Sequence, residues 1–152
     1  MDIKQGKNYT FLNAGPVADI KNAEFNSSII GSIKGKEFLK DKLGLSGMEV
    51  SLNYFPKNTA MPFFHKHNKN EELYLFLKGK GQFQVDDDIF DVEEGSMVRV
   101  SPQGARIWRN NSDEDFCFVV IQARENTMLE SDISDGSLVE REIKWPEETL
   151  VS

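Results

Sequence analysis

The sequence predicts an all-β fold in which short strands form a sandwich or a small barrel. Apolar and polar residues alternate in short segments such as 48–54, as they do in a half-buried strand. Turn signals separate these segments roughly every 8–12 residues, a spacing typical of sandwiches and small barrels. The eleven Phe residues also favour strands, because aromatic side chains pack well on a pleated surface.

The first part of the chain, residues 1–45, is expected to be an N-terminal arm that packs on the barrel or on a neighbouring subunit. Its first 30 or so residues are weakly patterned, with a turn signal at 13–16. Residues 36–43 carry apolar side chains at helical spacing and are followed by Gly44, a common helix stop. One short helix is therefore predicted there.

Residues 46–125 are predicted to form the barrel. The expected strands or extended segments are 48–54, 63–67, 73–77, 82–85, 89–92, 97–100, 105–109 and 116–122. The remaining residues, 126–152, are an acidic tail with at most one edge strand near 138–143. No repeat or linker interrupts the sequence, so these three parts are expected to make one domain.

Composition excludes two classes of partner. The net charge of −7 and the lack of a Lys/Arg run argue against nucleic acid. The longest apolar run, 116–121, is far too short to span a bilayer, so no membrane partner is expected. The single cysteine, Cys117, cannot form an internal disulfide, which favours a cytoplasmic location. Its apolar neighbours predict a buried structural residue.

The segment around His65 and His67 carries the strongest chemical signal. On a strand these two side chains share one face, whereas on a helix they would diverge by about 200°. A polar turn at 68–70 would reverse the chain and bring Glu72 back across both imidazoles. Two imidazoles and a carboxylate form the facial triad that suits a divalent first-row metal such as Fe, Mn, Ni, Zn or Cu. Glu71 is the rival carboxylate.

The same segment resembles the first motif of the cupin family. In that motif His-x-His is followed by four residues, Glu, six residues and Gly, which matches His65, His67, Glu72 and Gly79. A looser resemblance to the second motif follows, with one extra residue, at Gly95, Pro102, Gly104 and Asn111. The resemblance covers residues 48–122. It implies a double-stranded β-helix, or jelly roll, with a metal in the barrel mouth, and it makes a homodimer the expected assembly.

One position departs from the family pattern. The family's usual fourth ligand, a histidine, aligns with Ile107, and the chain has no third histidine to replace it. The protein then offers three ligands, so metal affinity is expected to be lower, or the metal to be absent. If Ile107 faces the site, replacing it with His should tighten metal binding.

Further residues are candidates for lining the pocket. Tyr74 and Phe76 follow Glu72 at intervals of two and should face inward with it. The full set of predicted lining residues is Tyr74, Phe76, Gln82, Gln84, Ile107, Arg109 and Gln122. If the strand near 105–109 is shifted by one residue, Arg106 and Trp108 take the inward positions instead.

Three functions fit these residues. The first is a metal-dependent enzyme, of oxygenase or isomerase type, acting on a small polar molecule. The second is a module that binds or senses a small molecule without turning it over, which suits a weak or absent metal. The third is a metal-free sugar epimerase, for which His65 and Tyr74 would be a loose match as base and acid.

Overall fold

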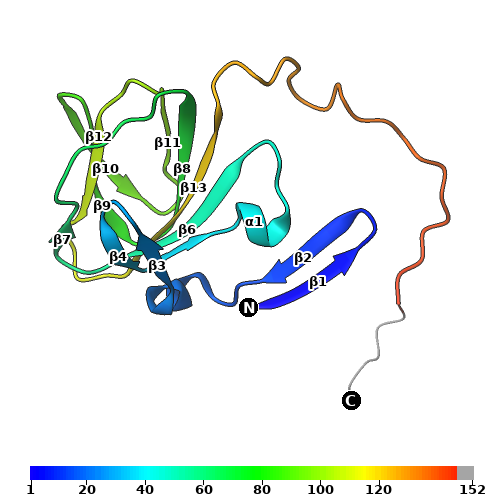
Figure 1. Ribbon diagram of the computed structural model, residues 1–152, viewed down its shortest axis with the longest axis horizontal. Coiled ribbons are helices and arrows are strands. Elements are labelled where there is room, and N and C mark those ends of the chain that lie inside the picture. Colours follow the sequence, from blue (N-terminus) through cyan, green and yellow to red (C-terminus); the bar gives the residue numbers. More distant parts are fainter. Residues whose placement is uncertain (147–152) are drawn as a thin grey trace.

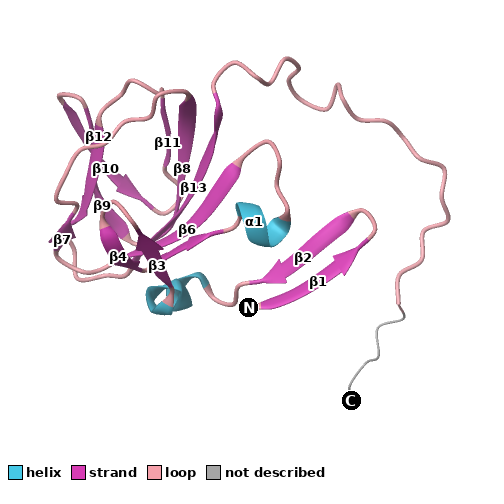
Figure 2. Cartoon of the chain, viewed as in Figure 1, coloured by secondary structure: helices cyan, strands magenta, loops and turns pink. Residues whose placement is uncertain are grey.

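The computed structural model describes residues 1–146, which fold mostly into β-strands (Figures 1 and 2). The elements are β1 (Asp2–Gly6), β2 (Tyr9–Asn13), the 3-10 helix η1 (Val17–Asn22), β3 (Glu24–Ser27), β4 (Gly31–Lys34), β5 (Lys36–Phe38), α1 (Lys40–Leu43), β6 (Glu49–Phe55), β7 (Thr59–Ala60), β8 (Asn70–Lys78), β9 (Lys80–Val85), β10 (Asp88–Glu93), β11 (Met97–Val100), β12 (Arg106–Asn110) and β13 (Phe116–Arg124). The predicted all-β class is confirmed.

Two sheets form the barrel. One has the strand order β11-β8-β13-β6-β5 and the other β10-β9-β12-β7. Their facing sides supply a single buried cluster: Tyr74, Phe76, Phe83, Val92, Val100, Phe116, Phe118 and Val120. Burying each large apolar side chain stabilises the fold by about 1.5–3 kcal/mol. The cluster therefore fixes which face of every strand points inward.

The pairing of β8 with β13 shows how core residues set the inward face of a strand. Tyr74 pairs with Val120 and Phe76 with Phe118, and all four are buried. Glu72 lies two residues before Tyr74 on β8, so its side chain points to the same interior. The strand that builds the core thus also carries a carboxylate into the barrel.

Gly79 is the turn between β8 and β9. Its backbone has φ of 79°, and a Cβ there would collide with the carbonyl oxygen of Asp115. Both the left-handed conformation and the close approach require glycine. This turn explains the glycine at the end of the His-x-His segment.

The N-terminal arm is more ordered than the sequence predicted, because it contains two antiparallel hairpins, β1–β2 and β3–β4. The helix predicted over 36–43 is only partly correct. Lys36–Phe38 is the edge strand β5, paired with β6, and the helix α1 begins at Lys40. Pairing with an open sheet edge satisfies the backbone groups of three residues that a helix would otherwise have used. Gly44 closes α1 with φ of 68°, as predicted.

The C-terminal tail departs from the sheet after Arg124. In Figure 1 it arches away from the barrel (orange), and residues 127–146 contain no strand. The edge strand expected near 138–143 does not form, and Leu138, Val139 and Ile143 are exposed. Nothing among residues 1–146 pairs with this segment. Neither helix in that range has the length and apolar content needed to cross a membrane.

Candidate metal centre and barrel cavity

The two histidines lie on the loop between β7 and β8, and backbone hydrogen bonds hold that loop to the barrel. The His65 N–H donates to the Arg106 carbonyl at 3.2 Å, and the Arg106 N–H donates back at 2.9 Å. The His67 N–H donates to the Pro102 carbonyl at 3.0 Å. This pairing gives His65 and His67 the same orientation, as the strand argument required. The chain then turns into β8 and brings Glu72 against them.

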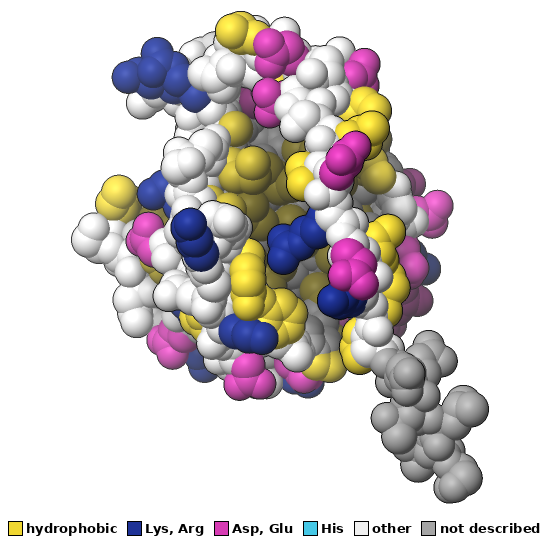
Figure 3. Space-filling view, turned by 90° about the vertical axis from the view of Figure 1, so that its right-hand side faces the viewer, with side chains coloured by type: hydrophobic (Ala, Val, Ile, Leu, Met, Phe, Trp, Pro, Cys, Tyr) yellow, Lys and Arg dark blue, Asp and Glu magenta, His cyan; other side chains and the backbone are white. Residues whose placement is uncertain are grey.

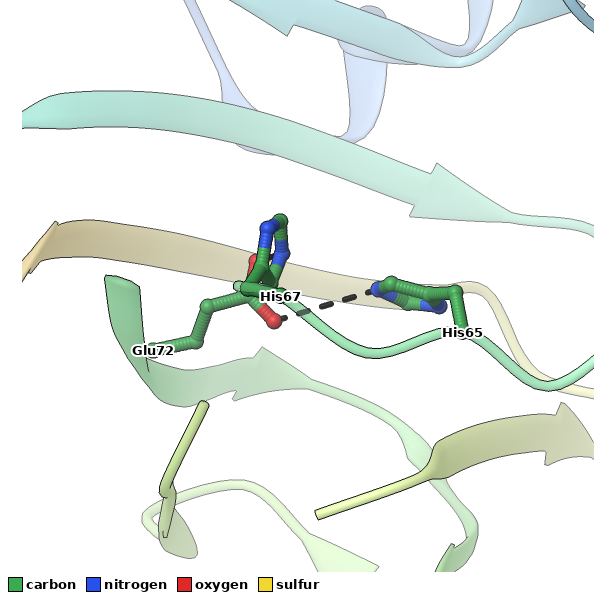
Figure 4. Close-up of side chains that lie close together, drawn as sticks. All are labelled: His65, His67 and Glu72. Carbon is green, nitrogen blue, oxygen red and sulfur yellow. Dashed lines mark ion pairs between the residues drawn. The ribbon is translucent and has the colours of Figure 1, made fainter. Parts of the chain in front are cut away.

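The three side chains converge on one point (Figure 4). Nε2 of His67 lies 3.0 Å from Oε1 of Glu72, and Nε2 of His65 lies 3.9 Å from Oε2. One ligand atom from each residue fits within a span of 4.8 Å. Two atoms bound at right angles to the same ion, each about 2.1 Å from it, would be about 3 Å apart. The donor set and its spacing therefore fit a divalent transition metal.

The two carboxylate oxygens of Glu72 differ in their hydrogen bonds. Oε2 accepts from the Tyr74 hydroxyl at 2.6 Å and from Nε of Arg106 at 3.0 Å. Oε1 has no such donor among the described residues, and the nearby His67 Nε2 is buried without an aligned hydrogen-bond partner. Buried polar atoms seldom lack a partner. An ion between Oε1 and the His67 nitrogen would satisfy both.

The electrostatics of His65 and Glu72 favour the protonation states that bind metal. Burial lowers the pKa of His65 to about 4, against the opposing charge of Glu72, so its imidazole is neutral at neutral pH. Burial alone would raise the pKa of Glu72, but the contacts with His67 and Tyr74 and the charges of His67 and Arg106 lower it to about 2. Burial and the Glu72 carboxylate raise the pKa of Tyr74, which stays protonated and donates.

Arg106 is a site residue that the sequence offered only as an alternative. It is fully buried, binds Glu72, and donates from Nη1 to the Gly104 carbonyl at 2.8 Å. Its guanidinium neutralises part of the carboxylate charge that a metal would use. Strand alternation could have identified it, had the register of β12 been known.

A cavity of about 560 Å³ opens beside the triad. Its polar lining includes His65, His67, Glu72, Tyr74, Asn53 and Lys36. Most of the remaining wall is apolar, with Ile29, Ile30, Ile33, Phe38, Phe55, Met61, Phe63, Trp108, Phe118 and Val120. Three parts of the chain supply these walls: the barrel strands, the 61–67 loop, and the hairpin β3–β4 with β5. The contribution of β3–β5 was not predicted.

The predicted lining residues divide into two groups. Tyr74 lines the cavity, whereas Phe76 lies in the core cluster behind it. Gln122 lies near the C-terminal end of β13 and does not line the cavity. Its Oε1 accepts from Nδ2 of Asn70 at 3.1 Å.

Ile107, Arg109, Gln82 and Gln84 lie on the outer face of the four-stranded sheet, around a shallow surface hollow. Their strands are paired so that Trp108 stacks on Phe83 inside the barrel. Because side chains alternate along a strand, the residues on either side of Phe83 and of Trp108 face outward. Ile107 therefore does not occupy a ligand position at the triad. The rival carboxylate, Glu71, is also outside, where it accepts from Arg99 at 2.7 Å.

Comparisons with known proteins agree with this fold. A cupin protein from Bacteroides fragilis matches 89% of this chain and 100% of its own, with 29% identity and a TM-score of 0.72. A proposed sugar phosphate isomerase from Acidithiobacillus ferrooxidans covers 75% of this chain and 74% of its own, with 22% identity and a TM-score of 0.61. That similarity shows a shared fold.

Two sequence matches add to the structural ones. An uncharacterized protein of Methanocaldococcus jannaschii is 36% identical over 39 residues, which is 26% of this chain and 31% of that protein. The cupin domain model matches residues 53–122, the segment that contains the triad and the strands from β8 to β12. The structure thus has the fold of the small cupins, and residues 53–122 of this chain are a cupin domain.

Proposed function

We propose that this protein is a metal-dependent cupin enzyme, of oxygenase or isomerase type, that transforms a small molecule in the barrel cavity. The observation that carries the proposal is the close approach of Glu72 Oε1 and His67 Nε2, which lie 3.0 Å apart beside the cavity and have no further polar partner among the described residues. The metal would be Fe, Mn, Ni, Zn or Cu, bound by His65, His67 and Glu72.

A metal bound there would act as a Lewis acid and orient a chelating substrate. The chain's own residues have supporting roles. Tyr74 and Arg106 fix the Glu72 carboxylate, so that only Oε1 is free to coordinate. The aromatic and aliphatic wall excludes water from the apolar part of the ligand. This wall favours a ligand with a larger apolar body than the small polar molecule that the sequence suggested.

A second candidate is a non-catalytic module that binds or senses a small molecule. The specific observation in its favour is Arg106, whose positive charge lies 3.0 Å from Glu72 and opposes a second positive charge there. The ion pair already satisfies one oxygen without any metal. In this alternative the triad is a polar patch that orients the ligand.

Metal content separates the two functions. Tag-free protein, expressed without added nickel, is analysed by elemental mass spectrometry before and after incubation with each metal and desalting. About one metal per chain in the wild type, lost in His67→Ala while the circular dichroism spectrum is kept, would support the enzyme. No metal in the wild type, even after incubation, would contradict it and support the binding module. His67→Ala that fails to fold would show a structural histidine, and His65→Ala then repeats the test.

The expected assembly and location belong to the same proposal. The β1–β2 hairpin exposes Ile3, Tyr9 and Phe11, which supports a homodimer. The lone Cys117 is buried as predicted, and its lack of a disulfide partner supports a cytoplasmic protein.

A further inference from the structure

We propose that Lys36 is the anion-binding residue of the cavity and that the ligand is an amphipathic organic carboxylate. Its carboxylate would bind the Lys36 ammonium, and its hydrocarbon part would lie against the apolar wall. The proposal rests on the proposed function to the extent that both place the ligand in this cavity, but it does not require a metal.

Lys36 reaches the cavity from the edge strand β5. Its Nζ donates to Oδ1 of Asn53 at 2.7 Å and to Oγ of Ser51 at 3.4 Å, and it lies 4.8 Å from the centre of the Phe38 ring. These contacts hold the ammonium in place. Both hydrogen-bond partners are neutral, so neither brings a negative charge into contact with the ammonium.

No carboxylate lies within 4.0 Å of the Lys36 ammonium among residues 1–146, although the chain is acidic overall. An ammonium has three N–H donors, and the two side-chain oxygens of Asn53 and Ser51 use two of them. A partly buried charge with no counter-ion in contact is costly, and proteins usually pair such charges. A ligand anion would supply both the missing charge and the third acceptor.

Burial lowers the pKa of Lys36 to about 8, and the negative charges of Glu72 and Glu49 oppose that shift. At pH 7 the amine is therefore mostly protonated and able to bind an anion. The same shift shows that the surroundings do not stabilise the charge as well as water does. A bound carboxylate would raise this pKa again.

The rest of the cavity defines the ligand's other part. Ile33, Phe38 and Phe118 belong to a wall that is mainly apolar around one ammonium. In sheet order, β13 and β6 separate the strand of Glu72 from the strand of Lys36. A ligand could therefore contact the triad at one position and Lys36 at another. A free inorganic anion would gain nothing from the apolar wall, which is why we commit to an organic carboxylate.

The test compares octanoate with octan-1-ol, two probes that differ at the charged end. Binding to the full chain is measured by calorimetry at pH 7, without added metal. We expect Lys36→Met to weaken octanoate binding at least tenfold and to change octan-1-ol binding by less than twofold. Lys36→Arg keeps the charge and should retain octanoate binding to within about threefold. The exposed Lys57, changed to Met, is the matched control and should behave as wild type.

Two results would overturn the proposal: octanoate binding unchanged in Lys36→Met, or no octanoate binding by the wild-type protein. Metal content of Lys36→Met is measured in parallel, and we expect it to equal that of wild type. A metal-free wild-type protein that still binds octanoate through Lys36 would contradict the metal-dependent enzyme and support the binding of a carboxylate by Lys36. If Lys36→Met does not fold, NMR of wild-type protein with ¹³C-methylated lysines replaces the variant. Octanoate must then shift the Lys36 resonance, and an unshifted resonance would contradict the proposal.

Discussion

At the scale of single residues, the ion pair between Arg106 and Glu72 is the least expected part of the site. Both side chains are almost completely buried, and Oε2 of Glu72 also accepts from Tyr74. Removing one partner of such a pair leaves a buried charge, whereas replacing both with apolar groups is often neutral. The pair is therefore expected to matter more for specifying this interior than for net stability.

We predict that Arg106→Met lowers the free energy of unfolding of the metal-free protein by about 3–5 kcal/mol. The double variant Arg106→Met/Glu72→Leu should recover most of that loss, because no charge is left unpaired. Urea denaturation measures both. A double variant less stable than the single one would show that the two residues stabilise the fold by other contacts.

The pKa shifts of His65 and Glu72 predict how the metal-free protein responds to acid. The pKa of His65 falls from 6.5 to about 4 on folding, so the unfolded chain binds this proton first and stability declines as pH falls from 6.5 towards 4. The pKa of Glu72 falls from 4.5 to about 2, so its contribution is lost between those values. Urea midpoints across pH should show a continuous decline below pH 6.5. His65→Gln should flatten only the upper part, and an unchanged slope would contradict the assignment.

At the scale of elements, the register of β12 decides what faces the site. Trp108 stacks on Phe83 in the barrel and Arg106 binds Glu72, so Ile107 between them points outward. This register contradicts the expectation that a histidine at position 107 would add a fourth ligand. We predict that Ile107→His leaves metal affinity unchanged to within twofold, measured by competition with a chelator. Tighter binding would mean that β12 is shifted by one residue.

Local pattern in the sequence predicted much of the barrel but not its register. Alternation located β6 and the strands from β8 to β13, but not the short strand β7, and the spacing of His65, His67 and Glu72 located the triad. One strand shifted by a single residue exchanges its inner and outer faces, and Ile107 shows this directly. Cross-strand pairing sets that register, and the pattern of one strand does not contain it.

At the scale of the whole molecule, segments far apart in sequence build the cavity. Lys36 and Phe38 come from the arm, His65 from a loop, and Phe118 from a late strand. The arm has no long periodic pattern, and β5 joins the sheet only because β6 offers it an open edge. A side chain whose role depends on such a long-range pairing, like Lys36, cannot be identified from local spacing.

The outer face of the five-stranded sheet is also apolar. Cross-strand pairs place Val119 beside Leu75 and Leu52, and Ile121 beside Leu73 and Val50, all half-buried. Figure 3 shows the right-hand side of the view in Figure 1, where hydrophobic side chains line an open hollow. A contiguous apolar surface of this kind is typical of a protein–protein interface.

This outer face predicts a homodimer in which the two sheets and their hairpins pack together. Sedimentation velocity at micromolar concentration should give twice the chain mass of 17.3 kDa. Leu75→Glu should shift the protein to monomer, because the carboxylate would be desolvated within the apolar surface. Ile89→Glu, on the exposed strand β10 of the other sheet, is the matched control and should remain dimeric. A wild-type monomer, or a dimer that Leu75→Glu leaves intact, would place the contact elsewhere.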